Sequence, residues 1–160
     1  MSVALVVPVL DEAKALPALV ERLAMLEPVP ADILMVDGGS GDESVAIAEA
    51  AGWRVITTER GRALQINAGV SEARGDLVCV LHADTLPPRD MVAVIEANLA
   101  DERVALAGFT PRICGPDTTR WVTTAHNIAK TWYAPLLTRP HLFVRGVRLL
   151  FGDHAMFFRR

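Results

Sequence analysis

The sequence predicts an α/β fold, with a mainly parallel sheet covered by helices on both faces. Short, continuous apolar runs rich in β-branched residues alternate along the chain with segments whose apolar residues recur at helical spacing. Strands buried on both faces are typical of parallel sheets, and the alternation of strand and helix supplies the crossovers such sheets need. The chain has 160 residues, 51% of them hydrophobic, which predicts one domain over 1–160 with a sizeable core.

Five apolar runs have the length and composition of buried strands. They are expected at 3–9, 31–37, 53–58, 76–84 and 104–110. The final part of the chain, 141–160, could add one or two closing strands.

Helices are expected between these strands, each with an apolar face. Their ranges are 12–25, 42–50, 61–75, 88–99 and 118–137. Asp42 is a candidate N-cap for the second helix. The inward positions expected of the third helix are Leu64, Asn67, Ala68 and Ser71. One side of the last helix collects Trp121, Ala125, Ile128, Ala129 and Trp132, a pattern that favours core packing over an acceptor or membrane-surface patch.

Composition excludes some classes of protein. The formal net charge of −3 argues against a nucleic-acid partner, since nucleic-acid binders usually carry a basic face. Cys79 and Cys114 lack metal-ligand spacing, and nothing requires an oxidising compartment. The first apolar run has no basic residues before it, and no run approaches ~20 residues, so neither a signal peptide nor a transmembrane segment is expected. A cytoplasmic protein is predicted, with peripheral membrane contact left open.

Acidic residues stand at the ends of three predicted strands. Asp11, Asp37 and Asp84 follow the first, second and fourth strands. Ligands of open parallel sheets bind beyond the carboxyl ends of the strands, and carboxylates gathered there need a cation or hydrogen-bond donors between them. The arrangement suits a sugar nucleotide with a divalent metal ion. The alternative is that each acid caps a turn or a helix.

Two further segments could hold phosphate. The turn GGSGDES, which includes Gly39, resembles a phosphate cradle but lacks both the lysine of a P-loop and the glycine order of a dinucleotide site. Arg60 and Arg62 stand where a helix begins, and arginines beside free backbone N–H groups make an anion site that fits a diphosphate. Each arginine could equally be a solvated surface residue.

Two histidines lie next to candidate acids. His82 is two residues before Asp84, so on an extended strand both side chains would point to one side and could flank a metal ion or a ribose. Asp153 precedes His154, a pair that could transfer a proton, although a turn with an exposed aspartate explains it as well.

Together these segments resemble glycosyltransferase family 2, whose members have the Rossmann-like GT-A fold. The resemblance runs through VVPVLDEA, VDGGSGDES, GRALQINAG, ARGD, LHADTLPP and FGDHAMFFRR, and so covers nearly the whole chain. It is strongest to the small subgroup associated with radical-SAM, selenodomain or arsenosugar gene contexts.

The resemblance implies roles for individual residues. The implied base pocket is lined by Pro8, Asp11 and Glu12. Asp37 is implied to contact the base or ribose, and Arg62 and Asn67 to lie near the base and phosphates. Asp84 is implied to bind the metal as the second acid of a DxD-type motif.

Two departures from the family pattern matter. His82 replaces the first acid of the DxD-type motif, although the subgroup shares this histidine. The Glu-Asp pair that usually follows the terminal arginines, and that supplies the general base, is not reached before Arg160, so the chain is expected to be truncated at its C-terminus. Asp153 is the nearest stand-in for the base.

The expected function is therefore an inverting glycosyltransferase. A sugar would move from a nucleotide-diphosphate donor to an acceptor hydroxyl, with Mg²⁺ or Mn²⁺ neutralising the leaving diphosphate. Residues 1–110 would form the donor-binding half, and 111–160 the start of the acceptor side. Two alternatives stay open: a nucleotidyltransferase that makes sugar nucleotides, and a non-catalytic module that binds them.

Overall fold

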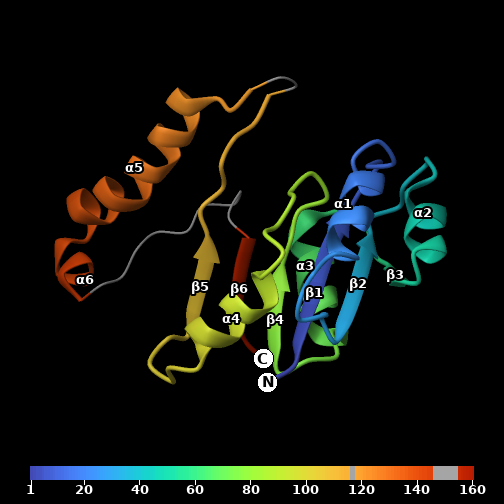
Figure 1. The fold of residues 1–160 in the computed structure, drawn as a ribbon, viewed down its shortest axis with the longest axis horizontal. Coiled ribbons are helices and arrows are strands. Elements are labelled where there is room, and N and C mark those ends of the chain that lie inside the picture. The colour runs from blue at the N-terminus through green and yellow to red at the C-terminus, as the bar shows by residue number, and fades with distance from the viewer. Residues whose placement is uncertain (116–117, 146–154) are drawn as a thin grey trace. The chain divides into compact units, whose positions relative to one another are not determined.

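The computed structural model describes residues 1–115, 118–145 and 155–160. The described residues form a sheet with helices on both of its faces (Figure 1). The strands are β1 Val3–Val9, β2 Asp32–Asp37, β3 Arg54–Thr57, β4 Leu77–Val80, β5 Leu106–Phe109 and β6 Ala155–Arg159. The helices are α1 Leu16–Leu23, α2 Ser44–Ala50, α3 Arg62–Glu72, α4 Met91–Leu99, α5 Trp121–Thr138 and α6 Pro140–Val144.

The strand order is β3-β2-β1-β4-β6-β5, which confirms the predicted α/β class. The pairs β1–β2, β1–β4 and β2–β3 are parallel, with Val9 opposite Asp37 and Val6 opposite Val80. Because parallel strands end at the same edge, the loops that follow β1, β2 and β4 gather there. That edge is where a ligand is expected in such a sheet.

Both faces of the parallel strands are covered. Helix α3 packs on one face, against a cluster made by Ala4, Val6, Leu34, Val36, Ala73 and Val78. The alternate residues of the same strands, such as Leu5 and Met35, are also fully buried, so the opposite face is covered too. Figure 1 shows α3 behind the sheet and α4 in front of it.

The chain divides into two compact units. The first contains Met1–Ala107 together with Phe157–Arg160, and the second contains Gly108–Met156. The end of the chain therefore returns to the first unit as β6, where the backbone N–H of Arg160 donates to the carbonyl of Asp76 at 3.0 Å. The expectation of closing strands over 141–160 is confirmed for 155–159 and wrong for 141–144, which belong to the short helix α6, with Pro140 in its first turn. Its part over 146–154 lies outside the described residues.

The predicted inward positions of α3 are wrong except for Ala68, which is partly buried against the core cluster. The buried residues are Gln65 and Gly69, whereas Leu64, Asn67 and Ser71 are exposed. The helix lies close to the sheet at Gly69, where an added Cβ would be 2.3 Å from Cγ1 of Val6 and 2.8 Å from Cγ2 of Val36. The absence of a side chain at this position allows the close approach and so fixes which side of α3 faces the strands.

Helix α5 also differs from its predicted packing. Its buried residues are Thr124, Asn127, Thr131 and Pro135. The expected apolar side is exposed, with Trp121 at 65% and Trp132 at 53% of their full accessible areas. The prediction that this side packs in the core is therefore wrong for the described residues. Trp132 contacts the ring of Phe143 of α6 edge-on, with 6.5 Å between the ring centroids. No helix in the described ranges is both long and apolar enough to cross a membrane.

Candidate functional site

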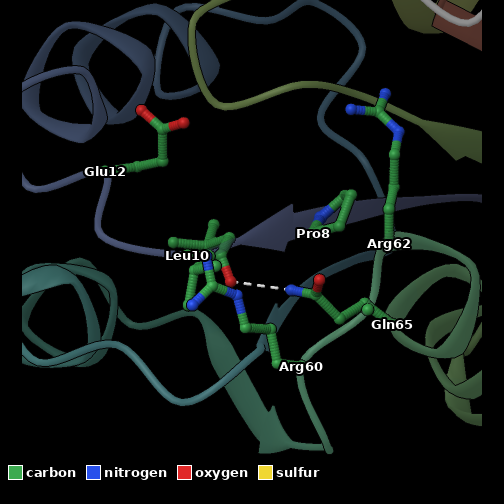
Figure 2. A pocket seen from close by; sticks show the side chains of 8 residues that line it. Pro8, Leu10, Glu12, Arg60, Arg62 and Gln65 are labelled. Atoms are coloured by element: carbon green, nitrogen blue, oxygen red, sulfur yellow. Dashed lines mark hydrogen bonds between the residues drawn. The ribbon is translucent and has the colours of Figure 1, made fainter.

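A pocket of about 260 Å³ lies at the carboxyl end of β1, within the first unit (Figure 2). Its lining comes from the end of β1, the loop after it, and the beginning of α3. The lining residues are Pro8, Val9, Leu10, Glu12, Arg60, Gly61, Arg62 and Gln65. The pocket thus combines a carboxylate, two guanidinium groups and an amide with the apolar residues Pro8, Val9 and Leu10.

Gln65 connects the floor of this pocket to the sheet. Its side chain is only 4% exposed, and its Nε2 donates to the carbonyls of Val9 at 2.7 Å and Val36 at 2.9 Å. These carbonyls belong to the ends of β1 and β2. Gln65 therefore holds the N-terminal part of α3 against both strand ends, and Figure 2 shows the bond to Val9.

The two arginines differ in their surroundings. Among the described residues, the exposed Arg60 makes no hydrogen bond or ion pair, so its charge is available to a ligand. Arg62 contacts His82 of the loop after β4, with its Nη2 2.6 Å from Nδ1 and 2.5 Å from Nε2 of the ring. Because a guanidinium group only donates, the ring nitrogen that bonds to it accepts. The loop after β4 is in this way tied to the rim of the pocket.

The pKa of Glu12, which lines the pocket, is raised. The first cause is burial, which removes water from the carboxylate, and the second is the negative charge of Asp84, followed by that of Asp42. A cation bound beside Glu12 would offset the part of this shift that comes from the neighbouring acids.

The carboxylates of Asp37 and Asp11 accept hydrogen bonds from residues of the loop after β2. The Asp37 carboxylate is 3% exposed and accepts from the backbone N–H groups of Gly39 and Ser40 at 3.0 and 3.1 Å and from the Ser40 hydroxyl at 2.6 Å. Asp11, whose φ is 55°, accepts from the N–H of Gly41 at 2.7 Å. Its own N–H donates to the Ser40 hydroxyl at 3.0 Å.

Asp42 and Ser44 make further contacts between the loops that follow β1 and β2. Asp42 accepts from the N–H of Ala13 at 2.9 Å and from the hydroxyl of Ser44 at 2.5 Å, and these bonds lower its pKa. The Ser44 hydroxyl in turn accepts from the N–H of Glu12 at 2.9 Å. The prediction of Asp42 as the N-cap is wrong, because the N-cap residue is Glu43, one position later. Asp42 instead joins the loops after β1 and β2.

The expected geometry of His82 and Asp84 is wrong. Strand β4 ends at Val80, and a turn follows in which the N–H of Thr85 donates to the carbonyl of His82 at 3.1 Å. The two side chains therefore do not share one side of an extended strand. In the described part of the chain, no three His, Cys, Asp or Glu side chains are placed to hold a metal ion.

The structure brings together only some of the predicted site residues. Pro8, Glu12, Arg60 and Arg62 line the pocket, with His82 and Asp84 at its side. Asp11, Asp37 and Gly39 (φ 90°) build the adjoining loops, Asn67 is exposed on α3 and does not line the pocket, and Asp153 lies outside the described residues. Gln65 was not predicted, although a glutamine four residues after the expected helix start at Gly61 was a visible signal.

Comparison with known proteins places the chain in a family. The model of the family described as "Glycosyl transferase family 2" matches residues 4–160. An undecaprenyl-phosphate 4-deoxy-4-formamido-L-arabinose transferase from Sodalis glossinidius is 37% identical over 111 residues, which are 62% of this chain and 34% of that protein. The protein of the same name from Yersinia enterocolitica is 30% identical over 118 residues, 66% of this chain and 36% of that protein. The chain thus spans about a third of the length of these curated relatives.

Solved structures show the same fold. Glucosyl-3-phosphoglycerate synthase from Mycobacterium tuberculosis, in complex with Mn²⁺, UDP-glucose and phosphoglyceric acid, has a TM-score of 0.71 at 18% identity and covers 99% of this chain and 56% of its own. S. aureus TarS in complex with UDP-GlcNAc has a TM-score of 0.58 at 19% identity and covers 66% of this chain and 33% of its own. At these identities the likeness extends to the fold alone, which confirms the GT-A-like architecture.

Proposed function

Because the chain belongs to glycosyl transferase family 2, we propose that it binds a nucleotide-diphosphate sugar and takes part in inverting transfer of the sugar to an acceptor. The observation that carries the proposal is the pocket at the end of β1, where Arg60 and Arg62 begin α3 and Gln65 closes the floor. Guanidinium groups at a helix N-terminus bind diphosphate through charge and through the free N–H groups of the first turn.

A divalent metal ion is part of the proposal. Mg²⁺ in proteins is commonly held by one or two carboxylates together with substrate phosphates. Asp84 would supply the carboxylate, and its nearness to Glu12, which raises the pKa of that group, fits a position that a cation would stabilise. When bound, the ion would neutralise charge on the departing diphosphate. The Mn²⁺ complex of the mycobacterial synthase supports this choice of ion.

We also propose an acceptor class. The curated relatives are named for undecaprenyl phosphate, which supports a lipid-linked phosphate as the acceptor. Residues 111–160 would begin the acceptor side, and Asp153 stays a prediction as the proton acceptor. Membership of the radical-SAM or arsenosugar subgroup and a cytoplasmic location are further parts of this proposal, the latter supported by the two free cysteines.

The proposal is tested by measuring nucleotide binding. Isothermal calorimetry with UDP and GDP, with and without Mn²⁺, is expected to show binding that Mn²⁺ strengthens. Asp84→Ala is expected to remove the metal-dependent part, while Asp101→Ala, which removes an exposed acid paired only locally with Arg103, keeps it. Absence of binding to any nucleoside diphosphate would contradict the donor site.

The same experiment separates the alternatives. Release of nucleoside diphosphate from a donor sugar supports a transferase, whereas pyrophosphate release from a nucleoside triphosphate and a sugar phosphate would indicate a nucleotidyltransferase. Nucleotide-sugar binding with no turnover would indicate a binding module.

A further inference from the structure

The orientation of the Gln65 amide is determined by its two partners. The carbonyl oxygens of Val9 and Val36 can only accept, and both lie within 2.9 Å of the same side-chain atom of Gln65. That atom must be the donor Nε2, because Oε1 facing two carbonyls would leave three acceptors together. The other end of the amide is therefore an acceptor, Oε1.

Oε1 is an acceptor without a partner. Among the described residues no donor reaches Oε1, although Gln65 is only 4% exposed. In Figure 2 the oxygen points toward Pro8, on the opposite side of the amide from its bonded carbonyl, and into the space lined by the arginines. A buried acceptor left unmatched costs free energy, so a donor group from a ligand is the natural partner.

The neighbours of Oε1 leave it as a single hydrogen-bond acceptor. Arg60 and Arg62 line the same pocket, but the Arg62 guanidinium bonds to His82, and in Figure 2 its side chain extends away from the Gln65 amide. Because both guanidinium groups are assigned to the diphosphate, Oε1 is left to read the base. A ring N–H group can pair with it, whereas a ring nitrogen that only accepts cannot.

We propose that Gln65 selects the base of the donor nucleotide, with Oε1 accepting a hydrogen bond from a ring N–H group: N3–H of uracil or thymine, or N1–H of guanine. The inference rests on the proposed function, since it assigns the base to the donor site. It makes Gln65 a specificity-determining residue. Cytosine and adenine would place a ring nitrogen acceptor against Oε1 and are disfavoured.

The engagement of Asp37 supports this assignment. The resemblance to the family implied Asp37 as the residue that contacts base or ribose, but its carboxylate is buried and accepts three hydrogen bonds from Gly39 and Ser40 of its own turn. Gln65 has the free acceptor that Asp37 lacks. Gly38 contributes by its missing side chain, since a Cβ there would be 3.0 Å from Nε2 and 3.2 Å from Oε1 of Gln65.

The ligand side of the proposal is tested on the unmodified chain. Calorimetry compares UDP with 3-methyluridine diphosphate, in which a methyl group replaces the N3 hydrogen, and with CDP, whose N3 is an acceptor without added bulk. Loss of the paired donor is expected to weaken binding at least about tenfold for both analogues. If UDP binds and the analogues bind equally well, the role of Gln65 is wrong while the donor site stands. If no nucleotide binds, the proposed function itself is wrong.

Variants then assign the discrimination to one residue. Gln65→Lys keeps a donor toward the carbonyls of Val9 and Val36 but removes the acceptor, and Gln65→Met removes both. Each variant is expected to bind UDP and 3-methyluridine diphosphate with similar affinity, with circular dichroism verifying the fold. The matched control is Asp37→Asn, in which the ratio of the two affinities is expected to stay as in the parent chain. Loss of the ratio in Asp37→Asn, with its retention in Gln65→Lys, would overturn the proposal in favour of Asp37.

Discussion

Asp42 illustrates how a single acid in this chain serves the loops rather than a ligand. It accepts hydrogen bonds from the Ser44 hydroxyl and from the backbone N–H of Ala13, in that order of importance for its lowered pKa. The acid therefore joins the segment after β1 to the segment before α2. Its contribution to stability must depend on its charge.

The sign of that dependence follows from the lowered pKa of Asp42. The folded state favours the carboxylate, so stability from Asp42 is present above the ordinary pKa of 3.8 and is lost as pH falls through the lower folded-state value. Asp42→Asn is expected to lower the urea midpoint at about pH 7 and to have a smaller effect at about pH 2. Glu43→Gln is the control, since Glu43 makes no side-chain capping bond. An equal loss at both pH values would show that the charge is irrelevant.

At the scale of single residues, sequence could indicate the site only in part. The acids and arginines were visible because their positions follow strand ends and a helix start. Which of the acids would be consumed by turn N–H groups depends on loop geometry, and Asp37 was for this reason assigned to the ligand. Gln65 was overlooked because a buried amide between two strand ends can be recognised only when it is known which strand ends the helix faces.

Helix α3 shows why its phase could not be predicted from apolar spacing. Leu64 and Ala68 suggested an inward side, but the residues that the helix buries against the sheet are Gln65 and Gly69. Neither Gln65, whose amide bonds to backbone carbonyls, nor Gly69, which has no side chain, contributes to a pattern of apolar residues. The close approach of backbone to strand, which decides the phase, appears only in three dimensions.

Gly69→Ala tests this account of α3. The methyl group would lie 2.3 Å from Cγ1 of Val6, and the expected loss in the free energy of unfolding is about 1–3 kcal/mol by overpacking. Urea unfolding provides the measurement, and Ser71→Ala, on the exposed side of α3, is expected to change stability little. Adding Val6→Ala to Gly69→Ala should recover part of the loss. If Gly69→Ala is stabilising, as it would be in an exposed helix, the close packing is wrong.

Across the whole molecule, β6 joins the two faces of the sheet. Side chains alternate along a strand, and here Arg159 donates to the carbonyl of Leu99 at the end of α4, while Arg160 donates to those of Ala73 and Ser71 at the end of α3. Cations at helix C-termini are stabilised by the exposed carbonyls and the helix dipole. The parallel core and its helices could be predicted from apolar runs, but this connection could not, since it depends on where β6 enters the sheet.

Arg159→Met and Arg160→Met test the connection. Each is expected to lower the free energy of unfolding by about 0.5–2 kcal/mol, and the double variant by roughly the sum, because the two arginines act on different helices. Chemical denaturation measures all three. Arg103→Met, which removes an exposed pair with Asp101, is the control and should cost less. Losses no greater than that of the control would show that β6 does not fasten these helices.

The contact between Gly38 and Gln65 has a consequence for evolution. A side chain at position 38 would occupy the space of the amide, so the two positions should vary together among homologues. Lineages that keep glutamine at 65 should keep glycine at 38, and those with a shorter residue at 65 are free to enlarge position 38. A change of nucleotide preference within the family would then be inherited as a linked pair of substitutions in segments 27 positions apart.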